Sequence, residues 1–244
     1  MPLPPQVTLR DYRVTAHRMI AEETFELTLS PSDAANRIPD PLAGQWVMLH
    51  LLEADGTVWA KAAYSIANAA DEVIASGNIV LAIRVAGDFT QRAQRLAVGD
   101  LVRLQGPFGV FHLKPASHHY FFAGGIGITP MRSMILQSLA QEPSSSRTLF
   151  YSARTANETA YLEAFRALAA SPSSLAFIPC FTRETDSTIA GERGRVTDVL
   201  TRRPVQIADD ADCYVCGPRS FIDDVIRMLK EMGVDPKRIY MERF

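Results

Sequence analysis

One stretch constrains the fold of this chain more than any other: His119 to Met131, which reads HYFFAGGIGITPM. Its apolar run predicts a buried strand, and the residues after that run predict a tight turn and the start of a helix. Three glycines allow positive φ and close approach of a ligand to the backbone: Gly124, Gly125 and Gly127. Thr129 suits the helix cap and Pro130 the first turn, where free N–H groups bind phosphate. An ordinary glycine-rich connection would carry the same letters, so the context has to decide.

Composition restricts the class of protein. The chain has 244 residues, of which 47% are hydrophobic and 21% charged, with a formal net charge of −2. This balance is typical of a globular protein and provides no basic excess for nucleic acid and no polybasic segment for a membrane surface. The N-terminus lacks the pattern of a signal peptide, and no stretch reaches the roughly 18 apolar residues of a spanning helix. We therefore expect a soluble, cytoplasmic protein with no membrane span and no nucleic-acid partner.

The cysteines indicate neither a disulfide framework nor a metal site. Cys180, Cys213 and Cys216 are too few for such a framework, and a reducing compartment is the simpler interpretation. The last two form a CxxC, but a zinc site needs two further soft ligands, and no histidine has the required spacing. A thioredoxin-like CxxC would open a helix, whereas this one lies inside an apolar strand pattern. The sequence predicts no metal.

Periodicity divides the chain near the KPAS tetrapeptide at Lys114 to Ser117. Before it come short alternating segments punctuated by Gly and Pro, which predict a small antiparallel barrel of six strands. These segments are Val7 to Val14, Thr24 to Leu29, Gln45 to Leu52, Trp59 to Ile66, Ile79 to Val85 and Asp100 to Leu104. One helical insertion is expected, at Phe89 to Leu96, where apolar residues recur at helical spacing.

After the tetrapeptide, apolar strands alternate with amphipathic helices, which predicts a parallel, doubly wound α/β sheet. The expected strands are His119 to Ala123, Thr148 to Ser152, Ala176 to Phe181 and Cys213 to Cys216, followed by an extended tail from Arg238 to Phe244. The expected helices are Pro130 to Gln141, Tyr161 to Ala170, Val196 to Thr201 and Arg219 to Met232. The predicted domains are therefore residues 1–114 and residues 115–244.

In such a sheet the ligand lies beyond the carboxyl ends of the strands, where the winding reverses. The exits to inspect are GGIGITP, Ala153-Arg154-Thr155, Thr182-Arg183-Glu184 and Cys216-Gly217-Pro218. Two exits carry an arginine, and neither places a carboxylate directly on the strand end, where an NAD site would bind the ribose hydroxyl. This pattern favours the 2′-phosphate of NADP over NAD, although Arg154 and Arg183 are also consistent with solvated loop residues.

An ordered set of motifs carries a family resemblance. The set is Gly44-Gln45, Tyr64-Ser65-Ile66-Ala67, Gly87-Asp88-Phe89-Thr90, GPFGVF at Gly106 to Phe111, GGIGITP, Cys216-Gly217-Pro218 and Glu242-Arg243-Phe244. In this order, from about Val7 to Phe244, the chain resembles the ferredoxin–NADP reductase family of flavoproteins. The resemblance implies that the barrel binds a flavin, which we expect to be FAD, and that the sheet domain presents NAD(P)H to it.

The resemblance also implies roles for single residues. The flavin contacts are expected from Tyr64, Ser65, Ile66, Ala67, Thr90 and Phe244, with the ring of Tyr64 against one flavin face. The NAD(P) contacts are expected from Gly124, Gly125, Gly127, Thr129, Arg154, Arg183, Cys216, Gly217 and Pro218. Ser65, Cys216 and Glu242 form the expected catalytic group, which holds the nicotinamide and can supply a proton at the flavin N5 edge. Glu242 is equally consistent with a surface carboxylate, and Phe244 with a frayed end.

One position departs from the family pattern. Two residues before Tyr64 the family carries an arginine that binds the flavin phosphate, whereas this chain has Ala62. Lys61 is adjacent but belongs to the opposite face of a strand. Either Lys61 reaches round, or Arg84 from another strand substitutes, or the flavin is held loosely. A lost charge-assisted phosphate contact weakens binding roughly ten- to hundredfold.

The electron acceptor is not encoded in any motif of the chain. The resemblance implies a separate one-electron partner such as ferredoxin, flavodoxin, an oxygenase component or a ferric chelate, because the sequence contains no CxxxxCxxC iron–sulfur module. A non-catalytic flavin- or nucleotide-binding regulatory subunit is the main alternative, for which Ala62 would be an early sign of decay. A flavin-free dehydrogenase is a second alternative, but no acid–base partner for it stands at a strand exit.

Overall fold

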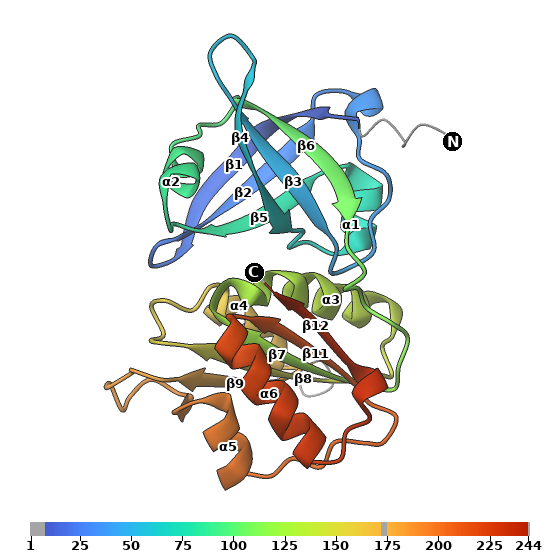
Figure 1. Ribbon diagram of the computed structural model, residues 1–244, viewed down its shortest axis with the longest axis vertical. Helices are drawn as coiled ribbons and strands as arrows, with labels where there is room; N and C mark the ends of the chain where they lie inside the picture. Colours follow the sequence, from blue (N-terminus) through green and yellow to red (C-terminus); the bar gives the residue numbers. More distant parts are fainter. Residues whose placement is uncertain (1–7, 172–174, 244) are drawn as a thin grey trace.

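A computed structural model describes residues 8–171 and 175–243, which fold into two halves lying one above the other (Figure 1). The upper half is a six-stranded antiparallel sheet in the order β4-β3-β6-β1-β2-β5. Its strands are β1 (Arg10–Ala21), β2 (Thr24–Pro31), β3 (Trp46–Leu52), β4 (Val58–Ser65), β5 (Ile79–Arg84) and β6 (Leu101–Phe108). Alternate residues of most strands, such as Phe25, Leu27 and Leu29 of β2, are fully buried and fill the interior, whereas β4 buries only Ser65. The predicted antiparallel barrel is confirmed.

The barrel closes through a narrow seam between its two terminal strands. Beyond the end of β4, Ile66 forms an isolated bridge to Leu81 of β5, and the Ala67 N–H donates to the Val80 carbonyl at 2.8 Å. Helix α2 (Asp88–Gln94) lies beside this seam, where Phe89 packs against Tyr64 of β4. The seam therefore carries most of the barrel residues that the motifs single out.

Two details of the barrel differ from the sequence-based expectation. Strand β1 continues to Ala21, well past the predicted end at Val14, and the predicted start at Val7 lies outside the described residues. A second helix, α1 (Ala70–Ser76), was not predicted. Only Ala70 and Val73 of this helix are buried, so its seven residues show too little apolar periodicity to be recognised in a sequence.

The lower half is a parallel sheet in the order β10-β9-β8-β7-β11-β12. Its strands are β7 (His118–Gly124), β8 (Ser146–Ala153), β9 (Ala176–Phe181), β10 (Glu192–Arg193), β11 (Asp212–Gly217) and β12 (Ile239–Arg243). Its helices are α3 (Ile128–Gln141), α4 (Leu162–Ala169), α5 (Val196–Arg202) and α6 (Arg219–Glu231). The predicted doubly wound α/β sheet is confirmed.

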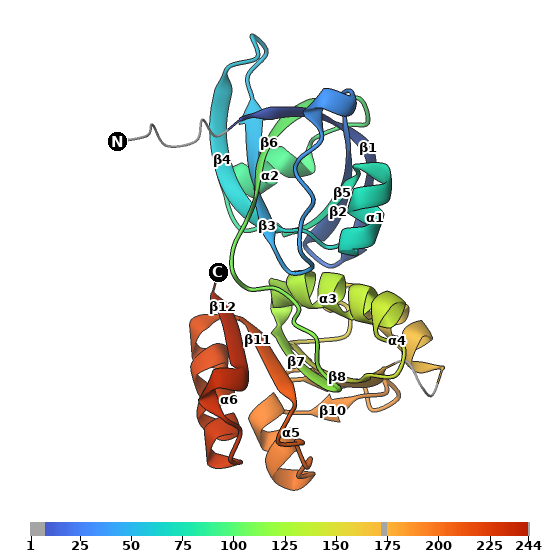
Figure 2. The same cartoon turned by 90° about the vertical axis from the view of Figure 1, so that its right-hand side faces the viewer.

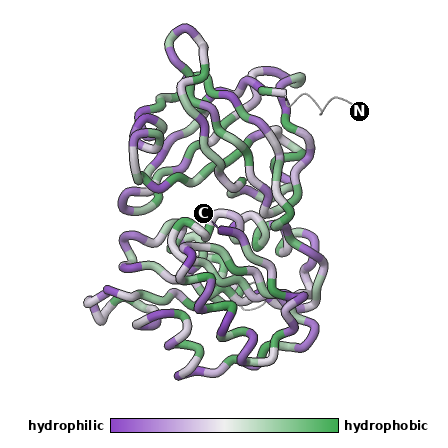
Figure 3. The backbone as a smooth tube through the Cα atoms, in the orientation of Figure 1, coloured by the Kyte–Doolittle hydropathy of each residue, from purple (hydrophilic) through white to green (hydrophobic). Residues whose placement is uncertain are grey.

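The helices cover both faces of this sheet, as Figure 2 shows from the side. Helices α3 and α4 pack on one face and α5 and α6 on the other, each contributing apolar residues to a separate core cluster. Figure 3 shows that the apolar segments follow the strands of both halves. The winding reverses between β7 and β11, so the exits of these two strands lie side by side. Within residues 8–171 and 175–243, no helix is both long enough and apolar enough to cross a bilayer.

The start of α3 differs from the predicted geometry. A short 3₁₀ turn, Gly125–Gly127, precedes the helix, which begins at Ile128 with Gly127 in the cap position. Thr129 is therefore inside the first turn and does not cap the helix; its hydroxyl donates to the Ile126 carbonyl at 2.8 Å. Of the three glycines only Gly125 has a positive φ, of 54°. The other two leave no room for a side chain, because the backbone of Cys216 lies against Gly127 and the side chains of Phe221 and Pro218 lie against Gly124.

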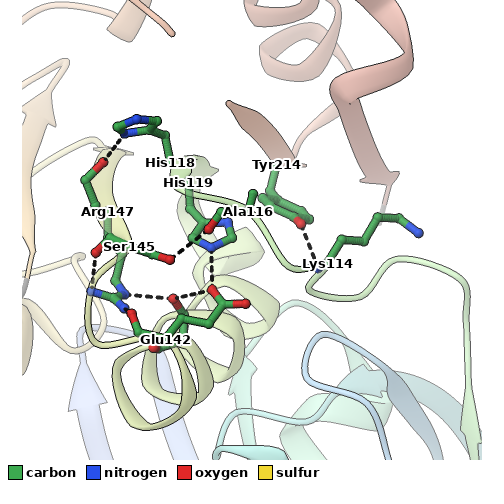
Figure 4. Close-up of polar contacts among 10 residues, drawn as sticks. Lys114, Ala116, His118, His119, Glu142, Ser145, Arg147 and Tyr214 are labelled. Atoms are coloured by element: carbon green, nitrogen blue, oxygen red, sulfur yellow. Dashed lines mark hydrogen bonds and ion pairs between the residues drawn. The ribbon is translucent and has the colours of Figure 1, made fainter. Parts of the chain in front are cut away.

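The far end of α3 is fixed by a buried polar cluster at the amino end of the sheet (Figure 4). Arg147 of β8 is 3% exposed and donates to the Ser138 hydroxyl at 2.7 Å, to the Ser138 carbonyl at 2.7 Å, to the Ser145 carbonyl at 2.8 Å and to the Glu142 carbonyl. His119 of β7 lies 2.6 Å from the Glu142 carboxylate. The planar guanidinium thus gives the Ser138 carbonyl a second donor besides the Glu142 N–H and satisfies the carbonyl of Glu142, the residue that caps α3.

We expect Arg147→Lys to lower the free energy of unfolding by about 1.5–2 kcal/mol, because an ammonium cannot reproduce the forked set of hydrogen bonds. Urea denaturation followed by circular dichroism measures the loss. Arg227→Lys on the exposed face of α6 is the matched control and should change stability by less than about 0.5 kcal/mol. Equal stability of both variants would contradict the role given to Arg147.

Candidate active site

The candidate site lies where the carboxyl ends of β7, β11 and β12 meet the barrel. Both ribbon views show β12 running toward the barrel and ending at the junction of the halves (Figures 1 and 2). One core cluster joins the halves, because it combines Ala43 and Phe111 with residues of α3 such as Met134. The two sets of predicted residues thus face one junction.

Aromatic rings line the barrel seam. Tyr64 is half-buried and stacks on Phe89, with ring centroids 6.1 Å apart, and Phe89 stacks in turn on Trp59 at 6.3 Å. The guanidinium of Arg92 lies over the Trp59 ring at 4.5 Å. Burial raises the pKa of the Tyr64 hydroxyl to about 12, so this side chain is neutral at any physiological pH. The aromatic rings gathered here provide an apolar surface on which a planar aromatic ligand can stack.

Two buried oxygens near the seam lack hydrogen-bond partners. Ser65 Oγ and Glu242 Oε2 are both shielded from solvent, and neither bonds to any atom of the described residues. Ser65 is paired in register with Trp46 of β3, so their side chains lie on one face of the barrel. A side chain added at Gly109 would meet the Trp46 ring at 2.9 Å and Glu242 Oε1 at 3.7 Å, so Glu242 lies close to the same tryptophan. Unsatisfied buried oxygens are costly, and a ligand with polar edges relieves them.

Cys216 completes this group from the parallel sheet. It is fully buried and lies beside Glu242 in the register of β11 and β12. Burial, and secondly the Glu242 carboxyl, raise the pKa of the Cys216 thiol well above its ordinary value, so it is a neutral thiol. Burial also raises the pKa of Glu242 to about 7. Cys216 and Glu242 thus lie next to each other. Glu242 also lies close to Trp46, which pairs with Ser65 in the barrel sheet.

The structure places the remaining predicted flavin residues in different surroundings. Ile66 and Ala67 form the seam contacts to β5. Thr90 fixes the turn before α2: its hydroxyl donates to the Gly87 carbonyl at 2.9 Å and accepts from the Ala86 N–H at 2.8 Å. Arg84 lies with the predicted nucleotide residues instead of with Tyr64, and it is 3.6 Å from each of the carboxylates of Glu23 and Glu158. Phe244 lies outside the described residues.

The glycines at the strand exits permit very close packing. A Cβ at Gly127 would lie 2.4 Å from the Cys216 carbonyl oxygen, and one at Gly217 would lie 2.9 Å from the Cα of Gly124. At Gly124 it would meet the ring of Phe221 at 3.0 Å. At Gly125 no atom lies within 4 Å, so this glycine faces open space. Gly125 is thus the glycine that a phosphate can approach, while the others let the turn and β11 touch.

Two neighbouring cavities open at the exits of β7, β8, β9 and β11. The smaller, of about 220 Å³, is lined by Arg84, Gly124, Gly125, Arg154 and Glu158. The larger, of about 590 Å³, is lined by Arg183 and by the segment from Gly194 to Asp198. They share four lining residues: Ser152, Thr182, Pro218 and Phe221. Their combined length along the strand exits suits an extended ligand such as a dinucleotide, with its phosphates at the glycine turn.

Sequence reasoning did not assign several residues that the structure places here. Phe89 was assigned only to a helix face, and Trp46, Trp59 and Arg195 were not assigned to the site. Trp59 lies at a β-bulge next to the turn of the β3–β4 hairpin, where the register shifts between Leu51 and Leu52. Trp59 and Tyr64 lie on one predicted strand, and their spacing was the signal that could have assigned Trp59 to the site. The bulge obscured this signal because it changes which face of the strand each residue occupies.

Two family models match the chain. The model of the oxidoreductase FAD-binding domain matches residues 11–113, and that of the oxidoreductase NAD-binding domain matches residues 121–227. The first covers the barrel and its seam, and the second covers the parallel sheet from β7 to β11 with the lining of both cavities except Arg84. The predicted division after residue 114 stays a prediction.

Relatives and solved structures agree with these models. A subunit of the Na⁺-translocating NADH-quinone reductase of Serratia proteamaculans is 30% identical over 226 residues, which are 85% of this chain and 55% of that protein. The phenol 2-monooxygenase reductase component DmpP of Pseudomonas sp. is 33% identical over 208 residues, covering 83% of this chain and 57% of the relative. The chain thus spans little more than half the length of these curated relatives.

The fold recurs in solved reductases. The Amycolatopsis cytochrome P450 reductase GcoB superposes with a TM-score of 0.82 at 27% identity, covering 98% of this chain and 71% of the other. A ferredoxin NADP⁺ reductase from Neisseria gonorrhoeae, solved with FAD and NADP, shares the fold with a TM-score of 0.79 at 19% identity, covering 98% and 99% of the two chains. Since the two family models cover the barrel and the parallel sheet in this order, the chain belongs to the ferredoxin–NADP reductase-like family of FAD- and nicotinamide-dependent oxidoreductases.

Proposed function

We propose that the chain transfers electrons from NADPH, through FAD at the barrel seam, to a separate one-electron acceptor protein such as an oxygenase component or a ferredoxin. FAD supplies the chemistry that accepts a hydride and returns electrons singly. The observation that carries the proposal is that two buried oxygens, Ser65 Oγ and Glu242 Oε2, lack hydrogen-bond partners among the described residues, while the buried Cys216 pairs with Glu242 in the register of β11 and β12. Such a group suits the polar edge of a flavin and the pyridine ring brought against it.

The barrel residues position the flavin and exclude water. Tyr64, backed by Phe89, offers its ring to one face of the flavin. Ser65 would donate a hydrogen bond at the N5 edge, and Glu242, whose pKa of about 7 lets it hold or release a proton near neutrality, would accept the proton that leaves N5 when the reduced flavin passes its electrons on. Cys216 is a small neutral group that packs against the nicotinamide. Because hydride transfer needs a reactant separation of about 3–3.5 Å, placement is the chief contribution of these residues.

The nucleotide residues favour NADPH. The glycine turn receives the pyrophosphate, and Arg183 lines the larger cavity at the exit of β9. Among the described residues Arg183 forms no ion pair, whereas Arg154 lies 3.7 Å from the Glu158 carboxylate. An exposed guanidinium without a carboxylate partner is suited to a 2′-phosphate. NADH is the competing donor, since the Serratia relative is named as part of an NADH-quinone reductase.

We expect Arg183→Ala to lower kcat/KM for NADPH about tenfold, because a charge-assisted contact to the 2′-phosphate is lost, and to leave kcat/KM for NADH within about twofold. Steady-state reduction of ferricyanide with each donor measures the ratio. Arg166→Ala on α4, which is ion-paired with Glu163, is the matched control and should leave both values unchanged. Equal losses for NADPH and NADH would instead assign NAD to this site.

The alanine at position 62 has a consequence for flavin affinity. Ala62 faces Leu49, and Tyr64 faces Val47, so both lie on one face of β4, while Lys61 is on the other. Arg92 is already held by two hydrogen bonds to the Glu53 carboxylate. We therefore also propose that the flavin is bound weakly, because this position lacks a cation that could bind the flavin phosphate.

We expect Ala62→Arg to tighten FAD binding about ten- to hundredfold, since it adds a charge-assisted contact to the flavin phosphate. Quenching of flavin fluorescence during titration of the apoprotein measures the dissociation constant. Ala63→Arg, on the opposite face of the same strand, is the control and should have little effect. Wild-type protein that keeps stoichiometric FAD through extended dialysis would argue against loose binding.

The experiment that tests the proposed function combines a spectrum with a turnover assay. Purified protein supplied with FAD should bind it, absorb as a flavoprotein, and reduce cytochrome c or ferricyanide with NADPH. A regulatory subunit that only binds the nucleotide would take up FAD without turnover, and a flavin-free dehydrogenase would stay colourless. Either result would replace the proposal.

A further inference from the structure

A buried carboxylate joins the two halves away from the candidate catalytic group. Glu26 of β2 is 6% exposed and accepts two hydrogen bonds, one from Arg18 Nε at 2.7 Å and one from the Tyr161 hydroxyl at 2.6 Å. Arg18 and Glu26 belong to the barrel, whereas Tyr161 directly precedes α4 of the parallel-sheet half. The Tyr161–Glu26 hydrogen bond therefore crosses the junction of the halves.

The backbone of Tyr161 is strained in the conformation that makes this bond. Its φ is 61°, in the left-handed region that is strained for a residue with a side chain. The ring is buried, with 6% of the residue exposed. Burial and the adjacent Glu26 carboxylate raise the pKa of the Tyr161 hydroxyl well above its ordinary value, so it remains a proton donor in the hydrogen bond. Strain of this kind persists where the surrounding contacts fix the residue.

Arg132 connects this cluster to the flavin segment. Its guanidinium lies over the Tyr161 ring at 4.6 Å, and its Nη1 donates to the Ala67 carbonyl at 2.7 Å. Ala67 is the last residue of the segment from Tyr64 to Ala67 that carries the proposed flavin contacts. Arg132 itself lies one turn into α3, directly after the glycine turn that receives the nucleotide.

The same side of α3 makes further contacts with the barrel. Ser133 Oγ donates to the Asn68 carbonyl at 2.7 Å, and Gln137 Oε1 accepts from the Asp71 N–H at 3.0 Å. An α-helix is a stiff element, so these contacts tie the glycine turn at its start to the chain that follows Ala67. Arg132 is the contact nearest the turn and the only one of these three that also reaches Tyr161 among the described residues.

We infer that Arg132 is a positioning residue which, with Tyr161 and Glu26, fixes the separation between the nucleotide-binding turn and the flavin-binding segment. The inference rests on the proposed function of both segments. Small displacements are costly for hydride transfer: an error of about 1 Å in reactant placement can slow such a step about a hundredfold. None of the three side chains needs to touch a reacting atom for this effect.

Two substitutions test the inference. Tyr161→Phe removes only the hydroxyl that reaches Glu26, and Arg132→Met removes the guanidinium while keeping most of the length of the side chain. Tyr120→Phe is the matched control, because it deletes a tyrosine hydroxyl that donates to the Gln206 carbonyl within the parallel-sheet half. If Arg132→Met does not fold, the milder Tyr161→Phe still gives the answer.

The first measurement needs no bound flavin. Pulsed electron–electron double resonance measures the distance between the halves from two spin labels. One label is attached at Val98→Cys, a barrel position that is 68% exposed, and the other at Lys230→Cys, which is exposed on α6. The native cysteines are buried, which restricts labelling to the introduced pair. The distance distribution should broaden in Tyr161→Phe and Arg132→Met and stay as narrow as wild type in Tyr120→Phe.

The second measurement uses the FAD-loaded protein. Stopped-flow reduction by NADPH should slow about tenfold in Tyr161→Phe and up to about a hundredfold in Arg132→Met, with the dissociation constants of FAD and NADPH within about threefold of wild type. The isotope effect with 4-deuterated NADPH should become more temperature-dependent, since a looser junction samples a wider range of separations.

The outcomes separate the inference from the proposed function. Narrow distance distributions and wild-type reduction rates in both variants would overturn the inference. A lower melting temperature with an unchanged reduction rate and distance distribution would assign the cluster to stability alone and would also overturn it. If wild-type protein loaded with FAD is not reduced by NADPH or NADH, the proposed function fails, while the label distances still decide whether the cluster fixes the halves.

Discussion

Gly127→Ala should lower the rate of flavin reduction by NADPH at least about a hundredfold. A Cβ at this position would lie 2.4 Å from the carbonyl oxygen and 2.6 Å from the carbonyl carbon of Cys216, so the turn and β11 must move apart. Both segments carry proposed nicotinamide contacts, and a displacement of about 1 Å is enough for a loss of this size. Overpacking of backbone against backbone should also lower the free energy of unfolding by about 1–3 kcal/mol. Stopped-flow absorbance and urea denaturation measure the two effects.

Gly56→Ala is the control for this substitution. Gly56 lies in the β3–β4 hairpin with a φ of 81° and no atom within 4 Å of its Cβ position, so only backbone strain of order 1 kcal/mol is expected there. Flavin reduction should be unchanged in this variant. A Gly127→Ala protein that is reduced at the wild-type rate would show that the contact between the turn and β11 does not set the nicotinamide geometry.

Glu242→Gln should slow oxidation of the reduced flavin by a one-electron acceptor about ten- to hundredfold at pH 8 without loss of the flavin, because the hydrogen that arrives at N5 as hydride leaves as a proton, which an amide cannot accept. Burial raises the pKa of Glu242 to about 7, so the acid form is present below that pH and the proton-accepting carboxylate above it. The wild-type rate should therefore rise as pH rises through about 7, whereas the rate of the variant should be nearly flat. A pH series of stopped-flow oxidation of the reduced flavin by ferricyanide measures both curves.

The same carboxyl predicts a pH dependence of stability. Its pKa is about 7 in the folded protein, above the ordinary value of 4.5 that applies to the unfolded chain. The folded state therefore binds the proton more tightly, so the stability contributed by this group is fully present below about pH 4.5 and is lost as pH rises through about 7. Relative to wild type, Glu242→Gln should gain melting temperature between pH 5 and pH 8. Glu163→Gln, which is 79% exposed on α4, is the control for both measurements and should match wild type. An inflection near pH 7 that persists in Glu242→Gln would assign the proton to another group.

Local sequence patterns were sufficient for most of the fold. The alternation of apolar and polar residues predicted the strands of the barrel, and the alternation of strands and helices predicted the parallel sheet. The misses have local causes. Helix α1 buries only Ala70 and Val73, and Thr129 fails to cap α3 because a 3₁₀ turn at Gly125–Gly127 carries the chain into the helix earlier. Where a helix begins depends on how the preceding turn packs in the tertiary structure.

The candidate site was predictable as a set of residues but not as an arrangement. The motifs named Ser65, Cys216 and Glu242, and the structure places them on β4, β11 and at the end of β12. The motifs could not show that Arg84 lies beside Gly125 and is ion-paired with two carboxylates, nor that Glu242 approaches Trp46, the register partner of Ser65. These facts depend on side chains that approach from distant parts of the chain.

The sequence by itself determined the order of the elements, the glycine turn and the chemistry of the side chains available to the site, because these follow from periodicity and residue type over short windows. Only the tertiary structure decided that Glu242 is dry enough to hold a proton near neutrality, that Gly127 must lack a side chain, and that Arg132 joins α3 to Ala67. Desolvation and steric contact are set by the atoms that surround a group, and here those atoms come from the other half of the molecule or from another strand.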